Sequence, residues 1–465
     1  MSVEPIGLVT LLIGLVCLLL GYRVAATTLV AAGLFGSAAA FIIGSANIQP
    51  GHMFLAFVAL ATLTRRREAL AAMRALSPSE PGFWFACLVL YGLLTAYLLP
   101  RILAGATQII PLGSTAFEDT GFTVPLSPVS SNFTQSVYMG ANLLCFAMTV
   151  AIASTASGFR AILTGLMAFS VGNIIFALLD LGTYATGTQD LLGFMRNAQY
   201  TLHTDVEVSG MKRIVGSFTE ASSFARSTLG ILGLTGTLWL CAYKPVWTGT
   251  IALVSLALLI LSTSSTGLVG APIVLLLLYW TALGRSGVKS GGRYSSLAVL
   301  CAPPLAVALA LILFIDPTTS AMIIDYVNLA VLDKATSDSG VERSSWNAVA
   351  LQNFLDTWGI GVGLGTVRAS SFLLALLANV GLPGAIFYGV FAATALLRSR
   401  GHTRSFPADI RLAARNACFG LILGDLLVSP VIDQGLFFYV LAGIASAMPE
   451  RQASNDRFAP VGAAA

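Results

Sequence analysis

Long runs of apolar residues, separated by short polar segments, dominate the pattern of this chain of 465 residues. Several runs approach or exceed the ~17 residues that a helix needs to cross the hydrocarbon core of a bilayer. Examples are 83–99, 161–179, 297–315 and 372–397. Lipid tolerates only helices and closed barrels, and these runs are too long for barrel strands. The pattern therefore predicts an all-α polytopic membrane protein.

We predict about 12 to 13 transmembrane helices, each near the length that spans a bilayer, in a single integral membrane domain over residues 1–465. The third span is short, and without it the N-terminus would change sides while the later topology would stay. The predicted spans are approximately 6–21, 25–44, 50–64, 82–100, 138–156, 161–181, 227–243, 247–262, 266–284, 296–315, 370–395, 411–428 and 432–448.

Composition agrees with this class. Hydrophobic residues make up 56% of the chain and charged residues 10%, whereas a soluble protein carries about 25% charged residues. All six cysteines fall inside predicted spans, so we expect them to pack as apolar side chains and not to form disulfides or metal sites. The net charge of +4 is explained by topology, and no nucleic-acid partner is expected.

Basic residues set the predicted orientation. Four arginines at positions 65, 66, 67 and 74 place the 65–80 loop in the cytoplasm by the positive-inside rule. With this topology, 17 of the 25 lysines and arginines lie on the cytoplasmic side. Three long loops then face outward, at 101–137, 182–226 and 316–369. Loops of this length are usually functional or disordered. The first is expected to be irregular, and the third contains helical patterns at 322–332 and 345–354 that would lie along the membrane surface.

The segment Met211–Ala225 closes the second outward loop and holds the densest set of candidate residues. Arg213 offers a permanently charged fork that suits phosphate. Glu220 lies at the water–membrane boundary, where a carboxylate could accept a proton from an attacking hydroxyl, and Ser222 and Ser223 follow it. An ordinary helix start explains the same residues, with Thr219 or Ser217 as N-cap and Glu220 in the first turn.

A second candidate segment lies at Trp358–Pro383, where glycines alternate from Gly359 to Gly365 and Arg368 follows. Alternating glycines, among them Gly363 and Gly365, can present backbone N–H groups to an anion. A flexible re-entry loop is the alternative explanation. Upstream, Arg343 could add a second cation, unless the adjacent Glu342 neutralises it.

Other candidates carry weaker signals. His203 lies in an outward loop near Asp205 and Glu207, but a lone loop histidine is usually a bystander. Asp180 and Asp425 lie near the outer ends of apolar segments, and intramembrane carboxylates are often functional. The run Leu261–Gly267, with sequence L-S-T-S-S-T-G, is either a tight turn or the wall of a polar cavity. No metal site is apparent.

The order of these motifs resembles a known family. An outward loop ends in R-x-x-G-x-F-x-E-x-S-x-F-A, and L-S-T-S-S-T-G joins two later spans. A large outward loop then ends in G-x-G-x-G, before a span that begins L-L-A-L-L-A-N-V-G-L-P-G. This order is similar to that of the O-antigen polymerase and O-antigen ligase superfamily of bacterial envelope proteins. The resemblance covers roughly residues 140–400.

The resemblance implies a glycosyltransferase of the bacterial inner membrane, with its active face in the periplasm and no cofactor. Such an enzyme moves a glycan from undecaprenyl diphosphate to the hydroxyl of another lipid-linked repeat unit. Arg213 and Arg368 would bind the diphosphate with help from Arg343, and Glu220 would activate the acceptor. The expected partners are undecaprenyl-diphosphate-linked oligosaccharides, the lipid bilayer, and a chain-length regulator and flippase of the same pathway.

One departure from the family pattern bears on the branch. Ligases usually carry a His-Asn pair before the span that follows the large loop, and this chain has Arg368-Ala369-Ser370-Ser371 there. The departure favours a polymerase of exopolysaccharide, O-antigen or capsule. An O-antigen or protein O-glycan ligase is one alternative. A multi-pass transporter or flippase is another, which would require broken helices and paired repeats that the sequence does not clearly show.

Overall fold

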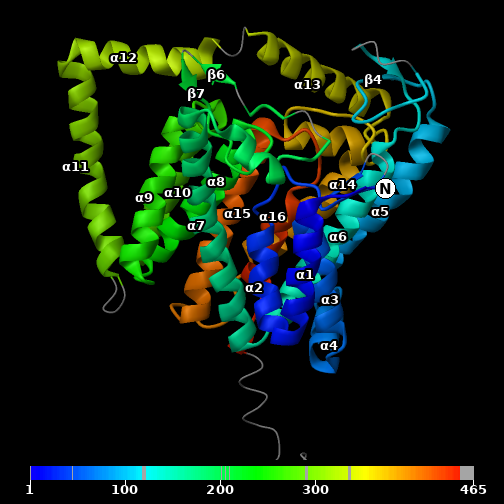
Figure 1. Ribbon diagram of the computed structural model, residues 1–465, viewed down its shortest axis with the longest axis horizontal. Helices are drawn as coiled ribbons and strands as arrows, with labels where there is room; N and C mark the ends of the chain where they lie inside the picture. The colour runs from blue at the N-terminus through cyan, green and yellow to red at the C-terminus, as the bar shows by residue number, and fades with distance from the viewer. Residues whose placement is uncertain are drawn as a thin grey trace, which may run out of the picture.

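The computed structural model describes residues 2–43, 46–117, 122–199, 202–204, 206–208, 210–287, 292–333 and 337–450. These residues form a helical bundle with a few strands of two or three residues (Figure 1). The helices are α1 (Pro5–Leu20), α2 (Tyr22–Ala32), α3 (Pro50–Leu63), α4 (Arg66–Ala75), α5 (Pro81–Ile102), α6 (Ser131–Ala153), α7 (Ala156–Thr186), α8 (Ala221–Leu240), α9 (Pro245–Leu261), α10 (Ser265–Arg285), α11 (Arg293–Ile315), α12 (Pro317–Val327), α13 (Asp338–Asp356), α14 (Phe372–Leu396), α15 (Phe406–Val428) and α16 (Gly435–Ser446).

The remaining elements are short. A 3₁₀-helix, η1 (Gln189–Met195), follows α7, and a π-helix, η2 (Asn328–Leu332), follows α12. Strands β1 (Ser2–Val3), β2 (Phe41–Ile43) and β3 (Ala46–Ile48) form one antiparallel sheet. Two further antiparallel pairs join β4 (Gln108–Ile109) to β5 (Val124–Pro125) and β6 (Glu207–Val208) to β7 (Met211–Lys212).

The helices confirm the predicted fold class, an all-α polytopic membrane protein. Within the described residues, six helices are long and apolar enough to cross a membrane: α5, α6, α7, α10, α11 and α14. Four more, α1, α3, α9 and α16, are apolar but shorter. Several helices begin with proline at the first turn, including α3, α5 and α9, where its missing N–H costs nothing and its fixed φ suits a helix.

The predicted span at 25–44 is wrong as a continuous helix. The helix α2 ends at Ala32, and the chain then passes through turns into β2. Small residues such as Ala38–Ala40 are buried there. The Ser37 hydroxyl donates to the carbonyl oxygens of Ser217 (3.0 Å) and Met195 (2.9 Å). Apolar character in this stretch therefore reflects burial under the second long loop and not a full crossing of the bilayer.

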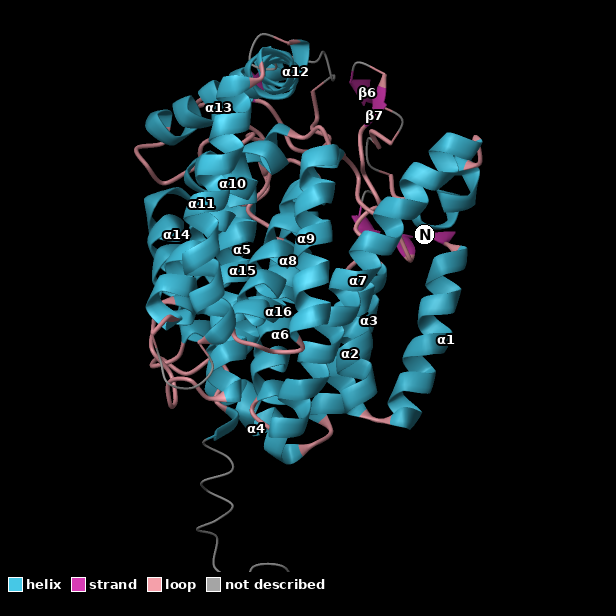
Figure 2. Ribbon diagram, turned by 90° about the vertical axis from the view of Figure 1, so that its left-hand side faces the viewer, coloured by secondary structure: helices cyan, strands magenta, loops and turns pink. Residues whose placement is uncertain are grey.

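The two ends of the bundle differ in kind (Figures 1 and 2). One end, called here the loop end, carries α12, α13, β4, β6 and β7, and the two helices lie across it. The opposite end, called here the basic end, carries α4 and the connection from α14 to α15. The predicted helical patches at 322–332 and 345–354 are confirmed by α12, η2 and α13. The described residues of the first long loop, 103–117 and 122–130, are irregular as expected, apart from β4 and β5.

Aromatic side chains fill the centre of the bundle between α5, α14 and α16. The Phe85 ring stacks on Tyr439 with ring centroids 4.6 Å apart and on Phe391 at 4.8 Å. The Phe169 ring of α7 stacks on Phe437 of α16 at 3.9 Å. All six cysteines are free. This core gives the loop end a fixed base.

Candidate functional site

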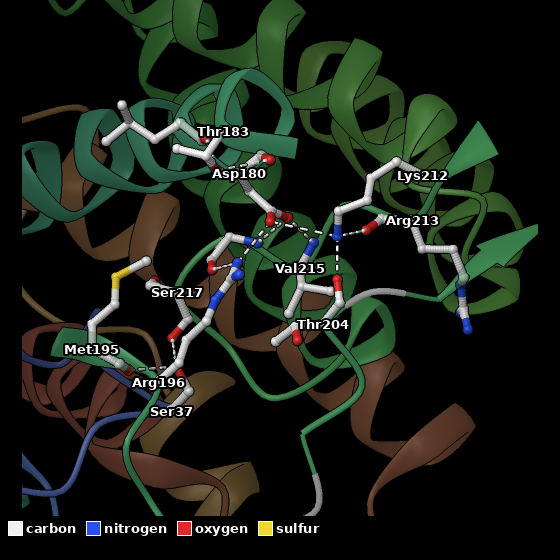
Figure 3. A network of polar contacts seen from close by, with 12 residues as sticks. Ser37, Asp180, Thr183, Met195, Arg196, Thr204, Lys212, Arg213, Val215 and Ser217 are labelled. Atoms are coloured by element: carbon white, nitrogen blue, oxygen red, sulfur yellow. Dashed lines mark hydrogen bonds and ion pairs between the residues drawn. The ribbon is translucent and has the colours of Figure 1, made fainter. Parts of the chain in front are cut away.

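Asp180, near the end of α7, fixes the loop that carries Arg213 (Figure 3). Its side chain is fully buried. One carboxylate oxygen pairs with Arg196 at 2.7 Å and Lys212 at 3.5 Å. The other oxygen accepts the backbone N–H groups of Val215 (2.8 Å) and Gly216 (3.0 Å). Two cations and two backbone N–H groups compensate the buried charge of Asp180. These four contacts hold the loop in place, and they are called here the Asp180 clamp.

The Arg213 side chain extends away from the Asp180 clamp. In Figure 3 the Arg213 guanidinium points away from Asp180, while its carbonyl oxygen accepts from Lys212 at 3.2 Å. The Arg213 amide donates to Val206 (3.1 Å), which ties it to the β6–β7 hairpin. Burial lowers the pKa of the half-buried Arg213, the Glu220 charge raises it and the Arg343 charge lowers it. Three charged groups from two loops therefore interact at the loop end.

Glu220 occupies the N-cap position of α8, so neither Thr219 nor Ser217 holds it. Its side chain makes no cap hydrogen bond. One carboxylate oxygen accepts from the buried Ser222 hydroxyl, and the other lies 3.5 Å from the Arg343 guanidinium. The side chains of Glu220 and Arg343 are 28% and 29% exposed, so solvent and a ligand can reach the pair. Ser223 is half-buried.

The helix α13 carries Arg343 and also contacts Arg368, the other arginine predicted for the site. Arg343 and Trp346 are one helical turn apart, and the Arg368 guanidinium lies over the Trp346 ring, 4.9 Å from its centroid. Asn347 of the same helix accepts the Ser370 N–H at 2.7 Å. Arg343 is therefore part of α13, and Arg368 packs against the same helix from the loop that follows it. Sequence reasoning missed that Trp346 connects them.

The two predicted glycines lie in close contact with neighbouring helices. Gly363 and Gly365 have φ of +108° and +77°, and an added Cβ would lie 2.7 Å from Thr95 O or 2.6 Å from Ser131 O. The Gly363 N–H donates to the Asn379 carbonyl at 2.8 Å, so it is not available to an anion. Close approach to α5 and α6 explains these glycines.

The glycine-rich loop also fills a break in α14. Gly381 has φ 62° and ψ −166°, which interrupts the helix. The Leu382 N–H donates to the Gly359 carbonyl at 2.8 Å, and the Asn379 side chain accepts the Thr366 N–H at 2.9 Å. The sequence did not clearly show a broken helix, and this one exists. The chain's own loop fills it.

A second buried network lies deeper, below the loop end. Two guanidinium nitrogens of Arg226 in α8 pair with the two carboxylate oxygens of Asp425 in α15. Gln434 donates to Asp425 at 2.9 Å and accepts from the Tyr388 hydroxyl at 2.8 Å. Asp425 is thus held in an ion pair between helices. The sequence offers one signal for this ion pair: Arg226 directly follows Phe224-Ala225, the last two residues of the motif that closes the second long loop.

The remaining candidates are His203 and the turn at Leu261–Gly267. His203 is exposed, and its backbone N–H donates to the carbonyl of Thr219, the neighbour of Glu220, at 3.0 Å. Asp205 lies outside the described residues. Within Leu261–Gly267, residues 262–264 form the turn between α9 and α10, and the side chains of Ser262, Thr263 and Ser264 are buried. Among the described residues no group of three His, Cys, Asp or Glu side chains could hold a metal ion.

No protein-family model and no curated protein sequence matches this chain. The case for a function therefore depends on the site. Arg213, Arg343 and Glu220 gather at the loop end, and Arg368 packs over Trp346 of the helix that carries Arg343. Such a group can bind an anion with more than one negative charge and can offer a carboxylate beside it.

Proposed function

We propose that this protein is a bacterial polysaccharide polymerase. It would transfer a glycan from undecaprenyl diphosphate to the hydroxyl of another lipid-linked repeat unit, at the periplasmic face of the inner membrane. One observation carries the proposal: Glu220 of the second long loop lies 3.5 Å from Arg343 of the third, and both charges act on the pKa of Arg213. The motif order that resembles the O-antigen polymerase and ligase superfamily supports it independently.

The proposed reaction matches the charges in the cluster. A bond forms between the acceptor oxygen and the anomeric carbon, while the bond from that carbon to the diphosphate oxygen breaks. The diphosphate leaves with the electron pair, and the arginines stabilise its growing charge. Glu220 accepts the proton of the acceptor hydroxyl. Both lipid-linked substrates stay in the membrane, so a site at its surface can align them.

The test of the activity is the lipid-linked glycan profile of cells that lack the protein. We expect a single repeat unit on undecaprenyl diphosphate to accumulate and long polymer to disappear. Long lipid-linked polymer that accumulates without transfer to a final acceptor would instead identify a ligase. An unchanged profile would refute both activities and favour a transporter.

The test of the site compares arginine variants at equal expression. We expect Arg213→Ala and Arg343→Ala each to lower polymer yield by roughly 10²-fold or more, the usual effect of removing one group that stabilises transition-state charge. Arg101→Ala is the control, because Arg101 belongs to the same end and donates only to the Tyr97 carbonyl among described contacts. Normal yield from Arg213→Ala would contradict the diphosphate role, and full activity of Glu220→Gln would remove Glu220 as the base.

A further inference from the structure

The basic end of the bundle contains a cavity of about 530 Å³ that the proposed activity does not use. It lies where α10 ends, α14 ends and α15 begins, at the opposite end from α12 and α13 (Figure 1). Asp409 is the acidic residue in its lining. The arginines that line it are Arg285, Arg398, Arg400, Arg404, Arg411 and Arg415.

Two of these arginines are built into the wall. Arg411 is 6% exposed and pairs with both carboxylate oxygens of Glu450, at 2.9 and 3.1 Å. Gly401 packs on this pair with φ +66°, and an added Cβ there would lie 2.7 Å from the Arg411 guanidinium. Arg400 is 9% exposed and donates to the Thr394 and Ala395 carbonyls at the end of α14. The cavity is therefore a formed structure and not a loose group of side chains.

Other arginines in the cavity have little compensation. Arg285 pairs with Asp409 at 2.7 Å. Arg404 is exposed and makes no ion pair or side-chain hydrogen bond within the described ranges. Arg415 has one side-chain contact, at 3.5 Å to Asn416, and its Nε is buried without a partner among the described residues. The lining holds six arginines and one aspartate, so it has a surplus of positive charge. A partly buried guanidinium such as that of Arg415 is costly without an anion.

Topology alone does not require this arrangement. The positive-inside rule needs cations near the membrane surface, and exposed arginines such as Arg66 and Arg67 at the same end already meet that need. It does not need cations that converge on a concave site. The convergence indicates a ligand.

We propose that this cavity binds a phosphate group on the cytoplasmic side of the membrane. Arginine forks match phosphate oxygens in pairs, and basic pockets between transmembrane helices on that side bind anionic lipid head groups. The phosphate would belong either to an anionic phospholipid or to free inorganic phosphate. The site is independent of the polymerase activity, because it lies at the other end of the bundle.

Two binding measurements test this site on the purified full-length protein. In the first, native mass spectrometry counts phosphatidylglycerol molecules retained against a phosphatidylcholine background. In the second, the protein is held in phosphatidylcholine nanodiscs and its thermal midpoint is followed against inorganic phosphate, with sodium chloride at matched ionic strength. We expect saturable binding in at least one measurement. Lipid retention alone identifies the head group as the ligand, and a phosphate-dependent midpoint alone identifies the free ion.

The decisive comparison uses two double variants with the same change of charge. Arg404→Gln with Arg415→Gln should weaken binding by about tenfold or more, which is the loss of about 1.4 kcal/mol of binding free energy. Arg67→Gln with Arg74→Gln, at exposed positions of the basic end outside the cavity lining, should leave it unchanged. Arg404→Gln alone should weaken binding in a protein that folds normally. Absence of saturable binding in both measurements, or an equal loss in both double variants, would overturn the proposal.

Discussion

Two single residues, Asp180 and Asp425, place a buried carboxylate inside an apolar helix below the loop end. Each is almost fully buried, and each is paired with arginine. Asp180 also accepts two backbone N–H groups from the loop of Arg213. Intramembrane acids often mark a site of chemistry. Here Asp180 positions a loop, and Asp425 joins α8 to α15.

Asp180→Asn should destabilise the protein and displace Arg213. The substitution removes the negative charge that compensates Arg196 and Lys212, and breaking a buried ion pair in this way costs about 3–5 kcal/mol. We expect a clearly lower thermal midpoint in detergent and a loss of polymer yield. Asp190→Asn, at an exposed position in the same long loop, is the control and should leave both unchanged. An unaltered midpoint for Asp180→Asn would show that the clamp is not structural.

Sequence reasoning located the charged residues of the site but not their partners. Arg213, Glu220 and Arg343 stood out because cations and acids are rare beside predicted spans. Arg226 and Asp425 are 199 positions apart, and no local pattern indicates which of several arginines an isolated acid will meet. Their pairing depends on how α8 and α15 pack, which apolar periodicity does not specify.

At the scale of elements, α12 and α13 have the greatest bearing on the site, since they lie across the loop end. Both helices have polar N-caps. The Asp316 side chain accepts the Thr318 N–H at 3.1 Å to start α12, and the Ser337 side chain accepts the Gly340 N–H at 3.3 Å to start α13. A capped start satisfies donors that would otherwise be exposed. These caps set where each surface helix begins.

Asp316→Ala should loosen the first turn of α12. Hydrogen bonds from Thr319 and Thr318 lower the pKa of Asp316 below its usual 3.8. The folded-state pKa is lowered, so the cap is complete at neutral pH and is lost only as pH falls through that lowered pKa. We expect faster hydrogen exchange at the Thr318 amide at pH 7. Asp325→Ala, at an exposed position of the same helix, should not change it, and equal exchange rates in both variants would refute the cap.

Gly363→Ala should destabilise the glycine-rich loop whether or not a ligand binds there. The new Cβ would lie 2.7 Å from the Thr95 carbonyl oxygen. The backbone of Gly363 also has a positive φ, which residues with a side chain disfavour. We expect a lower thermal midpoint in the purified protein without substrate. Gly389→Ala, in α14 where an added Cβ meets nothing within 4 Å, should keep or raise the midpoint. A loss of activity with an unchanged midpoint would return Gly363 to an anion-binding role.

Elements were predictable where apolar runs were long and bounded by polar residues. The prediction for 25–44 failed because Gly33 and Gly36 interrupt the apolar run and the small residues Ser37–Ala40 follow. Such residues can pack in turns and strands beneath a loop as well as in a helix. The break at Gly381 was also missed, since a glycine and a nearby proline inside an apolar run are tolerated in membrane helices.

At the scale of the whole molecule, the loop end and the basic end predict a sidedness that labelling can measure. In a background without the six native cysteines, a cysteine at Thr188 or Ser337 should react with a membrane-impermeant maleimide added to intact cells. A cysteine at Thr403, in the cavity lining of the basic end, should react only after membrane disruption. The opposite pattern would invert the orientation and move the proposed active face to the cytoplasm.

The helix α11 behaves differently from the rest of the bundle. None of its most apolar 18-residue window is buried, and Figure 1 shows it standing beside α9 and α10 and leading directly into α12. Its first turn is held against α8, where the Ser295 hydroxyl donates to the Leu240 carbonyl at 3.0 Å. The exposed remainder of the helix has little packing that opposes a change of tilt, so we expect its tilt to follow the thickness of the surrounding bilayer. A thinner membrane would lean α11 further and draw α12 along the surface. Lipid chain length would in this way affect the position of the third long loop, which includes the helix that carries Arg343.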